Sequence, residues 1–149
     1  MMTYWRMHAK TALVWVVSAD LFAGLAAVAG GVGLVGGGIR FPSDWLSGTP
    51  FSGYTAPGLI LGIVVGGSAL VAAAISLLAN REAGAMASAI AGAVMIGWIV
   101  GEVALIGYVS WMQPAFFGYG LAMVALAALY RDATPSETDL STRHWRHAA

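Results

Sequence analysis

Long apolar runs alternate with short polar segments along the whole chain. The four runs cover residues 11–36, 57–79, 84–109 and 114–130. A helix of about 20 apolar residues is long enough to cross the hydrocarbon core of a bilayer. None of the runs carries the polar stripe that a helix on the surface of a soluble protein needs. The pattern therefore predicts an all-α membrane protein, a four-transmembrane-helix up-down bundle.

Charged residues are confined almost entirely to the segments between these runs. They make up only 9% of the chain, against about 25% in soluble domains. Only Asp20 and Glu102 lie inside a run, and an unpaired charge there costs at least ~2.5 kcal/mol. The expected surroundings are therefore a lipid bilayer. The formal net charge is zero, which argues against nucleic acid as a partner.

The distribution of lysine and arginine predicts the orientation of the bundle. Basic residues gather on the cytoplasmic side of membrane proteins, so we expect the N- and C-termini to be cytoplasmic. The resulting organisation is a transmembrane domain over 1–130 and a polar cytoplasmic tail over 131–149. In this topology Arg40 alone lies outside, and the other basic residues lie inside: Arg6, Lys10, Arg81, Arg131, Arg143 and Arg146.

The segment 37–56 is the only long connection between the runs, and it is rich in aromatic residues. Such residues favour the boundary between lipid and water, so we expect this loop to lie in the interface. A lid over a polar cavity is the alternative interpretation. Among the residues that the loop carries are Phe41, Trp45, Leu46, Phe51 and Tyr54.

Small residues recur at helical spacing within each run. In lipid, helices associate through close backbone approach at such residues rather than through the hydrophobic effect. We therefore expect these glycines to pack helices within the bundle, with self-association as a second use of the same motif. The predicted packing positions are Gly24, Gly62, Gly66, Gly97 and Gly101.

Asp20 and Glu102 are the candidate functional residues. A helix rises 1.5 Å per residue, which places Asp20 ~13 Å from the inner surface and Glu102 ~10 Å from the outer one. In a core ~30 Å thick their axial separation is then only ~7 Å. No lysine, arginine or histidine lies in a run, so desolvation favours protonated acids. Three roles stay open: hydrogen bonds between helices, contact with a basic residue of a partner protein, and a proton or cation relay.

Other chemistry finds no support in the residues. The chain has no cysteine, which excludes disulfides and thiol nucleophiles. Its three histidines, His8, His144 and His147, lie outside the runs, which excludes a bis-histidine haem inside the membrane. We therefore expect no catalytic residues, no metal site and no cofactor.

Three stretches carry a resemblance to a known kind of protein. They span 50–58 (PFSGYTAPG), 97–102 (GWIVGE) and 106–114 (IGYVSWMQP). Together they resemble segments of small bacterial membrane proteins with four spans, of the actinobacterial type, over about residues 11–130. The resemblance implies the four-span fold and carries no activity.

These observations predict a non-enzymatic, multi-pass protein of the cell membrane. We expect it to act as an accessory or interaction subunit, with a larger membrane protein or a second copy as partner. The alternative is a proton- or cation-coupled transporter or channel protomer that uses Asp20 and Glu102.

Overall fold

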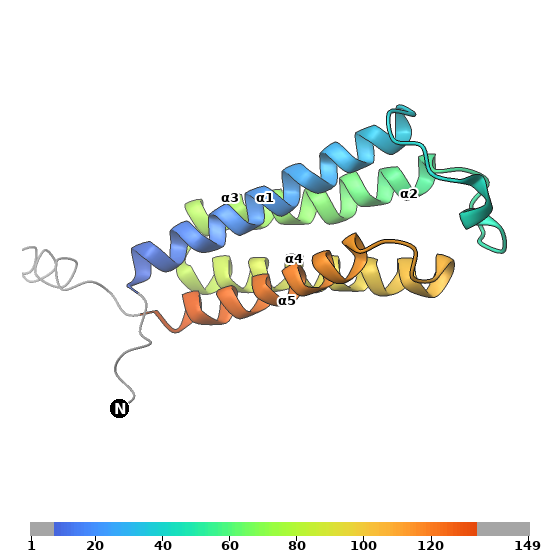
Figure 1. The fold of residues 1–149 in the computed structure, drawn as a ribbon. Helices are drawn as coiled ribbons and strands as arrows, with labels where there is room; N and C mark the ends of the chain where they lie inside the picture. Colours follow the sequence, from blue (N-terminus) through green and yellow to red (C-terminus); the bar gives the residue numbers. More distant parts are fainter. Residues whose placement is uncertain (1–7, 134–149) are drawn as a thin grey trace, which may run out of the picture.

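The computed structural model describes residues 8–133, and this part of the chain is almost entirely helical (Figure 1). The predicted polar tail over 131–149 lies outside the described residues from position 134 onward. The elements are α1 (Ala9–Val35), η1 (Ser43–Leu46), α2 (Thr55–Leu59), η2 (Ile60–Gly66), α3 (Gly67–Leu78), α4 (Arg81–Ile106) and α5 (Met112–Arg131).

Within residues 8–133, four helices are long and apolar enough to cross a membrane, as the sequence predicts. Three of them are α1, α4 and α5, and the fourth runs without a break through α2, η2 and α3. Within this fourth helix, η2 is a π-helical segment of seven residues. Its wider turns are rare in proteins and are frequently found at functional sites.

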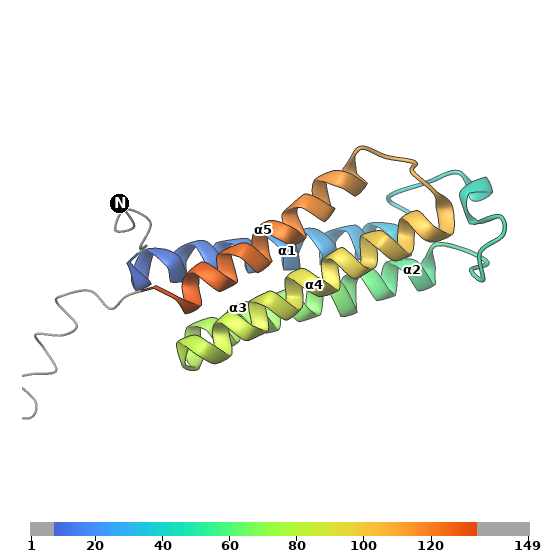
Figure 2. The same ribbon diagram turned by 90° about the horizontal axis from the view of Figure 1, so that it is seen from below.

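The helices form two hairpins that lie against each other (Figures 1 and 2). One hairpin is α1 with α2–η2–α3, and the other is α4 with α5. Both ends of the described chain and the turn at 79–80 lie at one end of the bundle, which we call the basic end because Lys10, Arg81 and Arg131 are there. The opposite end, with the connections 36–54 and 107–111, is the loop end. The hairpins diverge toward the loop end (Figure 1).

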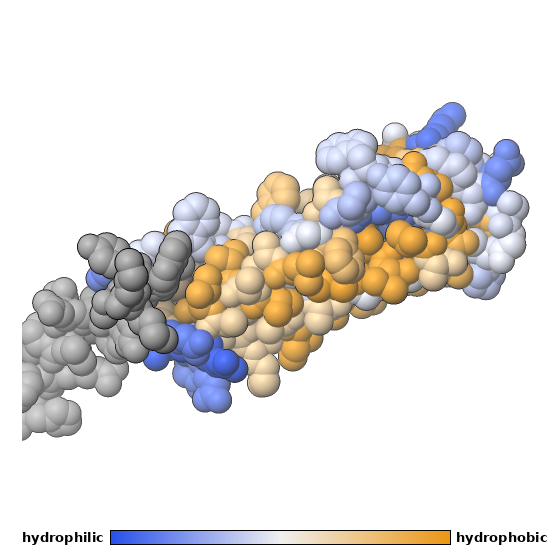
Figure 3. All heavy atoms as spheres, turned by 60° about the horizontal axis from the view of Figure 1, so that its bottom comes forward, coloured by the Kyte–Doolittle hydropathy of each residue, from blue (hydrophilic) through white to orange (hydrophobic). Residues whose placement is uncertain are grey.

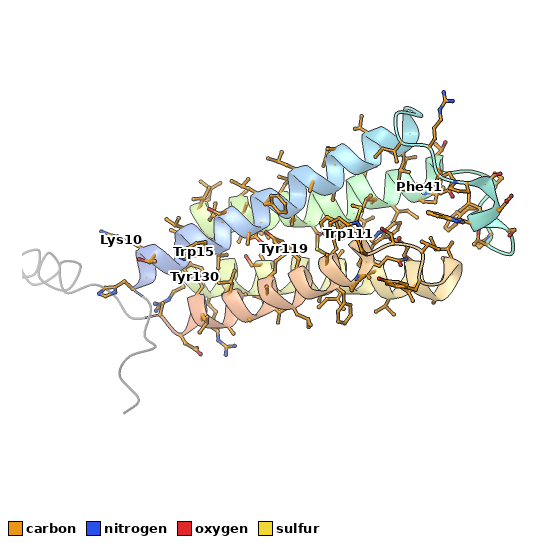
Figure 4. The ribbon with its side chains drawn as sticks, in the orientation of Figure 1. Lys10, Trp15, Phe41, Trp111, Tyr119 and Tyr130 are labelled. Atoms are coloured by element: carbon orange, nitrogen blue, oxygen red, sulfur yellow. The ribbon has the colours of Figure 1, made fainter. Side chains whose placement is uncertain are left out.

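The outer surface of the bundle suits lipid. Many large apolar side chains point outward, among them Leu25, Ile63 and Leu121. Figure 3 shows hydrophobic residues over the middle of one face and hydrophilic residues toward both ends. Figure 4 places Trp111 and Phe41 at the loop end, and Lys10 and Tyr130 at the basic end. Aromatic and basic residues at both ends of an apolar body are typical of a transmembrane bundle.

The helix bounds differ from the predicted ones most clearly at α4, which spans 81–106 instead of 84–109. The side chain of Asn80 accepts a hydrogen bond from the Ala83 backbone N–H at 2.9 Å, so the helix includes the charged residues Arg81 and Glu82. At its other end, Gly107 has a φ of 76°, a conformation that ends the helix and favours glycine. Capping thus sets both ends of α4. Hydropathy alone predicts each end three residues too far toward the C-terminus.

Glycines bring α1 and the second span into backbone contact. A Cβ on Gly24 would meet the Gly66 carbonyl oxygen at 3.2 Å, and one on Gly66 would meet the Gly24 carbonyl oxygen at 3.1 Å. A Cβ on Gly31 would lie 2.5 Å from the Gly58 carbonyl oxygen and 2.9 Å from the Gly62 Cα. A Cβ on Gly24, Gly31 or Gly66 would crowd the facing helix, and Gly62 lies directly opposite Gly31, so Gly24, Gly62 and Gly66 lie in the packing seam of this hairpin.

The structure differs from the expectation at Gly97 and Gly101, because neither packs against another helix. A Cβ on either residue would meet no neighbouring atom within 4 Å. The close approach between α4 and α5 instead uses Gly92, where a Cβ would lie 2.8 Å from the carbonyl oxygen of Gly120. Gly97 and Gly101 thus lie on a face of α4 that no other helix contacts.

Candidate functional site

A cavity of about 460 Å³ lies between the two hairpins toward the loop end. We call it the chamber. Its walls come from the last turns of α1, from α2 and η2, from the second half of α4, and from the start of α5. Most of its lining is apolar, and its volume falls in the range of small-molecule sites. The chamber is the clearest candidate site in the described part of the chain.

The connection after α1 forms a roof over the chamber. The rings of Phe41 and Trp45 stack with centroids 5.3 Å apart, and Phe41 lies 5.8 Å from the ring of Tyr54. The Tyr54 hydroxyl donates to the Pro42 carbonyl oxygen at 2.7 Å, and partial burial raises the pKa of this phenol. The aromatic residues of 37–56 thus cover a cavity, as in the lid interpretation, but this cavity is apolar rather than polar.

The side walls of the chamber are formed by the π-helix η2 and by a stretch of α4 that carries two glycines. One side is lined by three residues of η2, Ile60, Leu61 and Val65. The other side is lined by Gly97 and Gly101 of α4. Because nothing occupies the space beside these two glycines, they leave the chamber wide where a larger residue would narrow it.

Glu102 is the only residue with a charged side chain in the chamber lining that the structure describes. Its Oε1 accepts a hydrogen bond from the Gln113 Nε2 at 3.2 Å, and Trp98, one turn earlier on α4, also lines the chamber. A carboxylate offers about four lone-pair positions. Glu102 therefore keeps acceptor capacity that the protein itself does not use.

Gln113 holds the carboxyl group of Glu102 in place. Only 2% of this residue is exposed, and its Nε2 donates both to Glu102 and to the Gly107 carbonyl oxygen at 3.1 Å. Its Oε1 accepts from the backbone N–H groups of Val109, at 3.0 Å, and Ser110, at 3.4 Å. The amide thereby orders the connection between α4 and α5 and has no donor left for a ligand. Nothing in the sequence alone marks Gln113 as part of this site.

Asp20 lies in a separate cluster at the centre of the bundle. It is 1% exposed, and its Oδ2 accepts from the Ser88 Oγ at 2.5 Å. The Ser88 Oγ lies 3.4 Å from the Ser76 Oγ, so the cluster joins α1, α4 and α3. The Asp20 Oδ1 has no hydrogen-bond partner among the described residues. Because the side chain is enclosed, it is not available to a partner protein in this fold.

The structure separates the two acids much more than the sequence analysis predicts. Asp20 is bonded to Ser88, and Glu102 lies fourteen residues further along α4, which is about 21 Å of helix. The predicted ~7 Å is wrong because it confines both acids to a core ~30 Å thick, whereas α1 alone has 27 residues, or about 40 Å.

An apolar layer fills the space between the two acids. It is part of the central core cluster, with small residues from α1 and α4 and larger ones from α4 and α5: Ala23, Ala91, Met95 and Met123. These side chains offer no hydrogen-bond partner to a proton or an ion. The fold thus places Asp20 and Glu102 in different environments instead of one relay.

Comparisons with other proteins add no functional information. No protein-family model, curated protein or solved structure matches this chain. Within residues 8–133, no three histidine, aspartate or glutamate side chains are grouped in a way that would hold a metal ion. The chamber and the residues that line it are therefore the basis for a functional proposal.

Proposed function

We propose that this protein is a non-enzymatic membrane protein that binds an apolar, membrane-soluble molecule in the chamber between its hairpins. The observation that carries the proposal is the 460 Å³ cavity itself. The cavity is partly open between the diverging hairpins, and its volume and mostly apolar lining are those of a cleft that holds a small molecule.

The character of the lining supports an apolar occupant. The polar groups of the roof are used within the roof: the Thr49 hydroxyl donates to the Leu46 carbonyl oxygen at 2.8 Å and accepts from the Phe51 N–H at 3.3 Å. The Tyr54 hydroxyl is likewise used by Pro42. An occupant therefore meets carbon over almost all of its surface and gains the free energy of leaving lipid or water for a fitted apolar site.

Two tryptophans allow a direct test, because Trp98 lines the chamber while Trp15 lies on the outer surface and is 56% exposed. We would make two variants, each keeping one of these tryptophans and replacing the others by phenylalanine. Dibromododecanol, which quenches tryptophan at contact, is then titrated into the protein in uncharged detergent. We expect saturable quenching of Trp98 and only gradual, non-saturable quenching of Trp15. Parallel quenching of both would refute the proposal.

Filling the chamber provides a matched control. In the Trp98 variant, Gly101→Leu places a side chain in the open space inside the chamber, and we expect the saturable phase to weaken or disappear. Gly118→Leu on α5 is the control, because a Cβ there also meets nothing within 4 Å but the residue does not line the chamber. Equal loss in both variants would contradict binding in the chamber.

The proposed location is the cell membrane, with both termini in the cytoplasm. The apolar exterior of the bundle supports a membrane, and the excess of basic residues on the predicted inner side supports this orientation. A role as an accessory or interaction subunit stays a prediction; it requires that a larger membrane protein or a second copy co-purifies. A relay through both Asp20 and Glu102 is the weaker alternative, because about 21 Å of helix separates them.

A further inference from the structure

We infer that the molecule bound in the chamber is an amphipathic cation: an apolar body with a single amine group that meets the carboxylate of Glu102. This inference deepens the proposed function and depends on it. It follows from which polar atoms of the chamber remain free, from the charge that they carry, and from the space beside them.

Glu102 supplies the charged contact, because the polar groups of Gln113, Thr49 and Tyr54 bond to protein atoms. The Ser110 hydroxyl, which accepts from the Met112 N–H at 3.2 Å, carries no charge. Gln113 uses both of its N–H donors on protein atoms, one of them on Glu102 itself. Thr49 and Tyr54 bond to the backbone of the roof. The carboxyl group of Glu102 is left with acceptor positions that its donor, Gln113, does not fill.

The charge of this group selects the kind of ligand. Desolvation favours the protonated acid when no ligand is bound, and a ligand ammonium offsets this effect. Glu102 therefore meets the ligand as a carboxylate, which only accepts hydrogen bonds and requires a head group that donates. Among the described residues that line the chamber, no lysine, arginine or histidine is present to balance the charge. An apolar site makes an unbalanced carboxylate costly, and an ammonium group on the ligand removes this cost while it forms a charged hydrogen bond.

The surroundings of Glu102 fit an ammonium group with an apolar body. Trp98 lies one turn before Glu102 on the same helix and also lines the chamber, so its ring is placed to attract a cation next to the carboxylate. Gly101 and Gly97, on the same stretch of α4, leave open space beside the acid. An alkyl or aryl body extends from the head group into this space, under the aromatic roof.

A competition experiment tests the choice of ligand. In the single-Trp98 protein, the bound brominated alcohol is displaced by dodecylamine or by dodecanol, which differ only in the head group. We expect dodecylamine to bind on the order of ten-fold more tightly, as one charged hydrogen bond implies. Glu102→Gln removes the charge and should reduce the preference to about one-fold, while dodecanol still binds. Glu82→Gln, at the start of α4 and outside the chamber, should keep the full preference.

The outcomes separate this inference from the proposed function. Equal binding of amine and alcohol to the wild-type chain overturns the inference and leaves the apolar chamber intact. A preference for amine that persists in Glu102→Gln also overturns it. Loss of saturable binding for every probe overturns the proposed function instead.

One further ligand and one further variant complete the experiment. Tighter binding of the uncharged acceptor 2-dodecanone than of the amine would mean that a protonated Glu102 donates, which contradicts the inference. Should Glu102→Gln fail to fold, Glu102→Asp keeps the charge but withdraws it by one methylene. It should retain a reduced preference for the amine, and an unchanged preference would contradict direct contact.

Discussion

Gly31→Ala is the substitution that most sharply tests the packing of α1 against the second span. The new Cβ would lie 2.5 Å from the Gly58 carbonyl oxygen and 2.9 Å from both the N and the Cα of Gly62. All three atoms belong to the backbone, so the two helices must move apart. Overpacking of this kind costs about 1–3 kcal/mol, and three backbone contacts place Gly31 at the upper end. Alanine regains about 1 kcal/mol of helix propensity, which leaves a net loss of about 2 kcal/mol.

Reversible unfolding in mixed micelles with increasing fractions of SDS, followed by circular dichroism, measures this loss. A free-energy change of about 2 kcal/mol lowers the folded-to-unfolded ratio roughly thirty-fold. Gly101→Ala is the matched control, because a Cβ there meets nothing within 4 Å, and it should leave stability unchanged or raise it by up to about 1 kcal/mol. Equal stability of Gly31→Ala and the wild type, or an equal loss in Gly101→Ala, would refute the reasoning.

Four further predictions follow from single residues. Gly107→Ala should cost about 1–3 kcal/mol in the same titration, because Gly107 has a φ of 76°; an unchanged midpoint would contradict this. Gln113→Leu removes four hydrogen bonds and should cost about 2–6 kcal/mol at about 0.5–1.5 kcal/mol each, whereas a loss below 1 kcal/mol would show that water replaces them. Ser88→Ala removes the donor to Asp20 and should cost about 1–3 kcal/mol, an effect absent in an Asp20→Ala background. Cysteines introduced at Ser47 and at Glu82 should react with an impermeant maleimide from opposite sides of the membrane, and labelling from one side would reject the topology.

The sequence predicts the four spans well because each is a long apolar run in which Asp20 and Glu102 are the only charged residues. The helix bounds are harder to predict, since they depend on local capping: the Asn80 side chain starts α4 and Gly107 ends it. Hydropathy does not register either event. It places the start of α4 after Arg81 and Glu82, which the structure includes in the helix.

The glycines show why packing could be predicted only in part. Small residues four positions apart identify a face where another helix can approach, and Gly24 and Gly66 lie on such a face. The same spacing at Gly97 and Gly101 marks a face that no helix covers. Periodicity describes the shape of one helix surface, but what lies against that surface depends on how the hairpins diverge.

The polar contacts of the site were beyond the reach of sequence reasoning for a different reason. The two acids stand out in an apolar run, but Ser88 and Gln113 are neutral residues of a kind found in many membrane helices. Their importance comes from partners that only the fold brings near: Ser88 meets Asp20, 68 residues away, and Gln113 meets Glu102 across the connection between α4 and α5.

An experimental structure in lipid nanodiscs, determined after incubation with dodecylamine, tests the central claim most directly. The account predicts elongated non-protein density between the hairpins, with one end at the Glu102 carboxyl group and the body beside Gly97 and Gly101. Hairpins that close along their whole length, with these two glycines buried against α1 or the second span and no density between them, would contradict it.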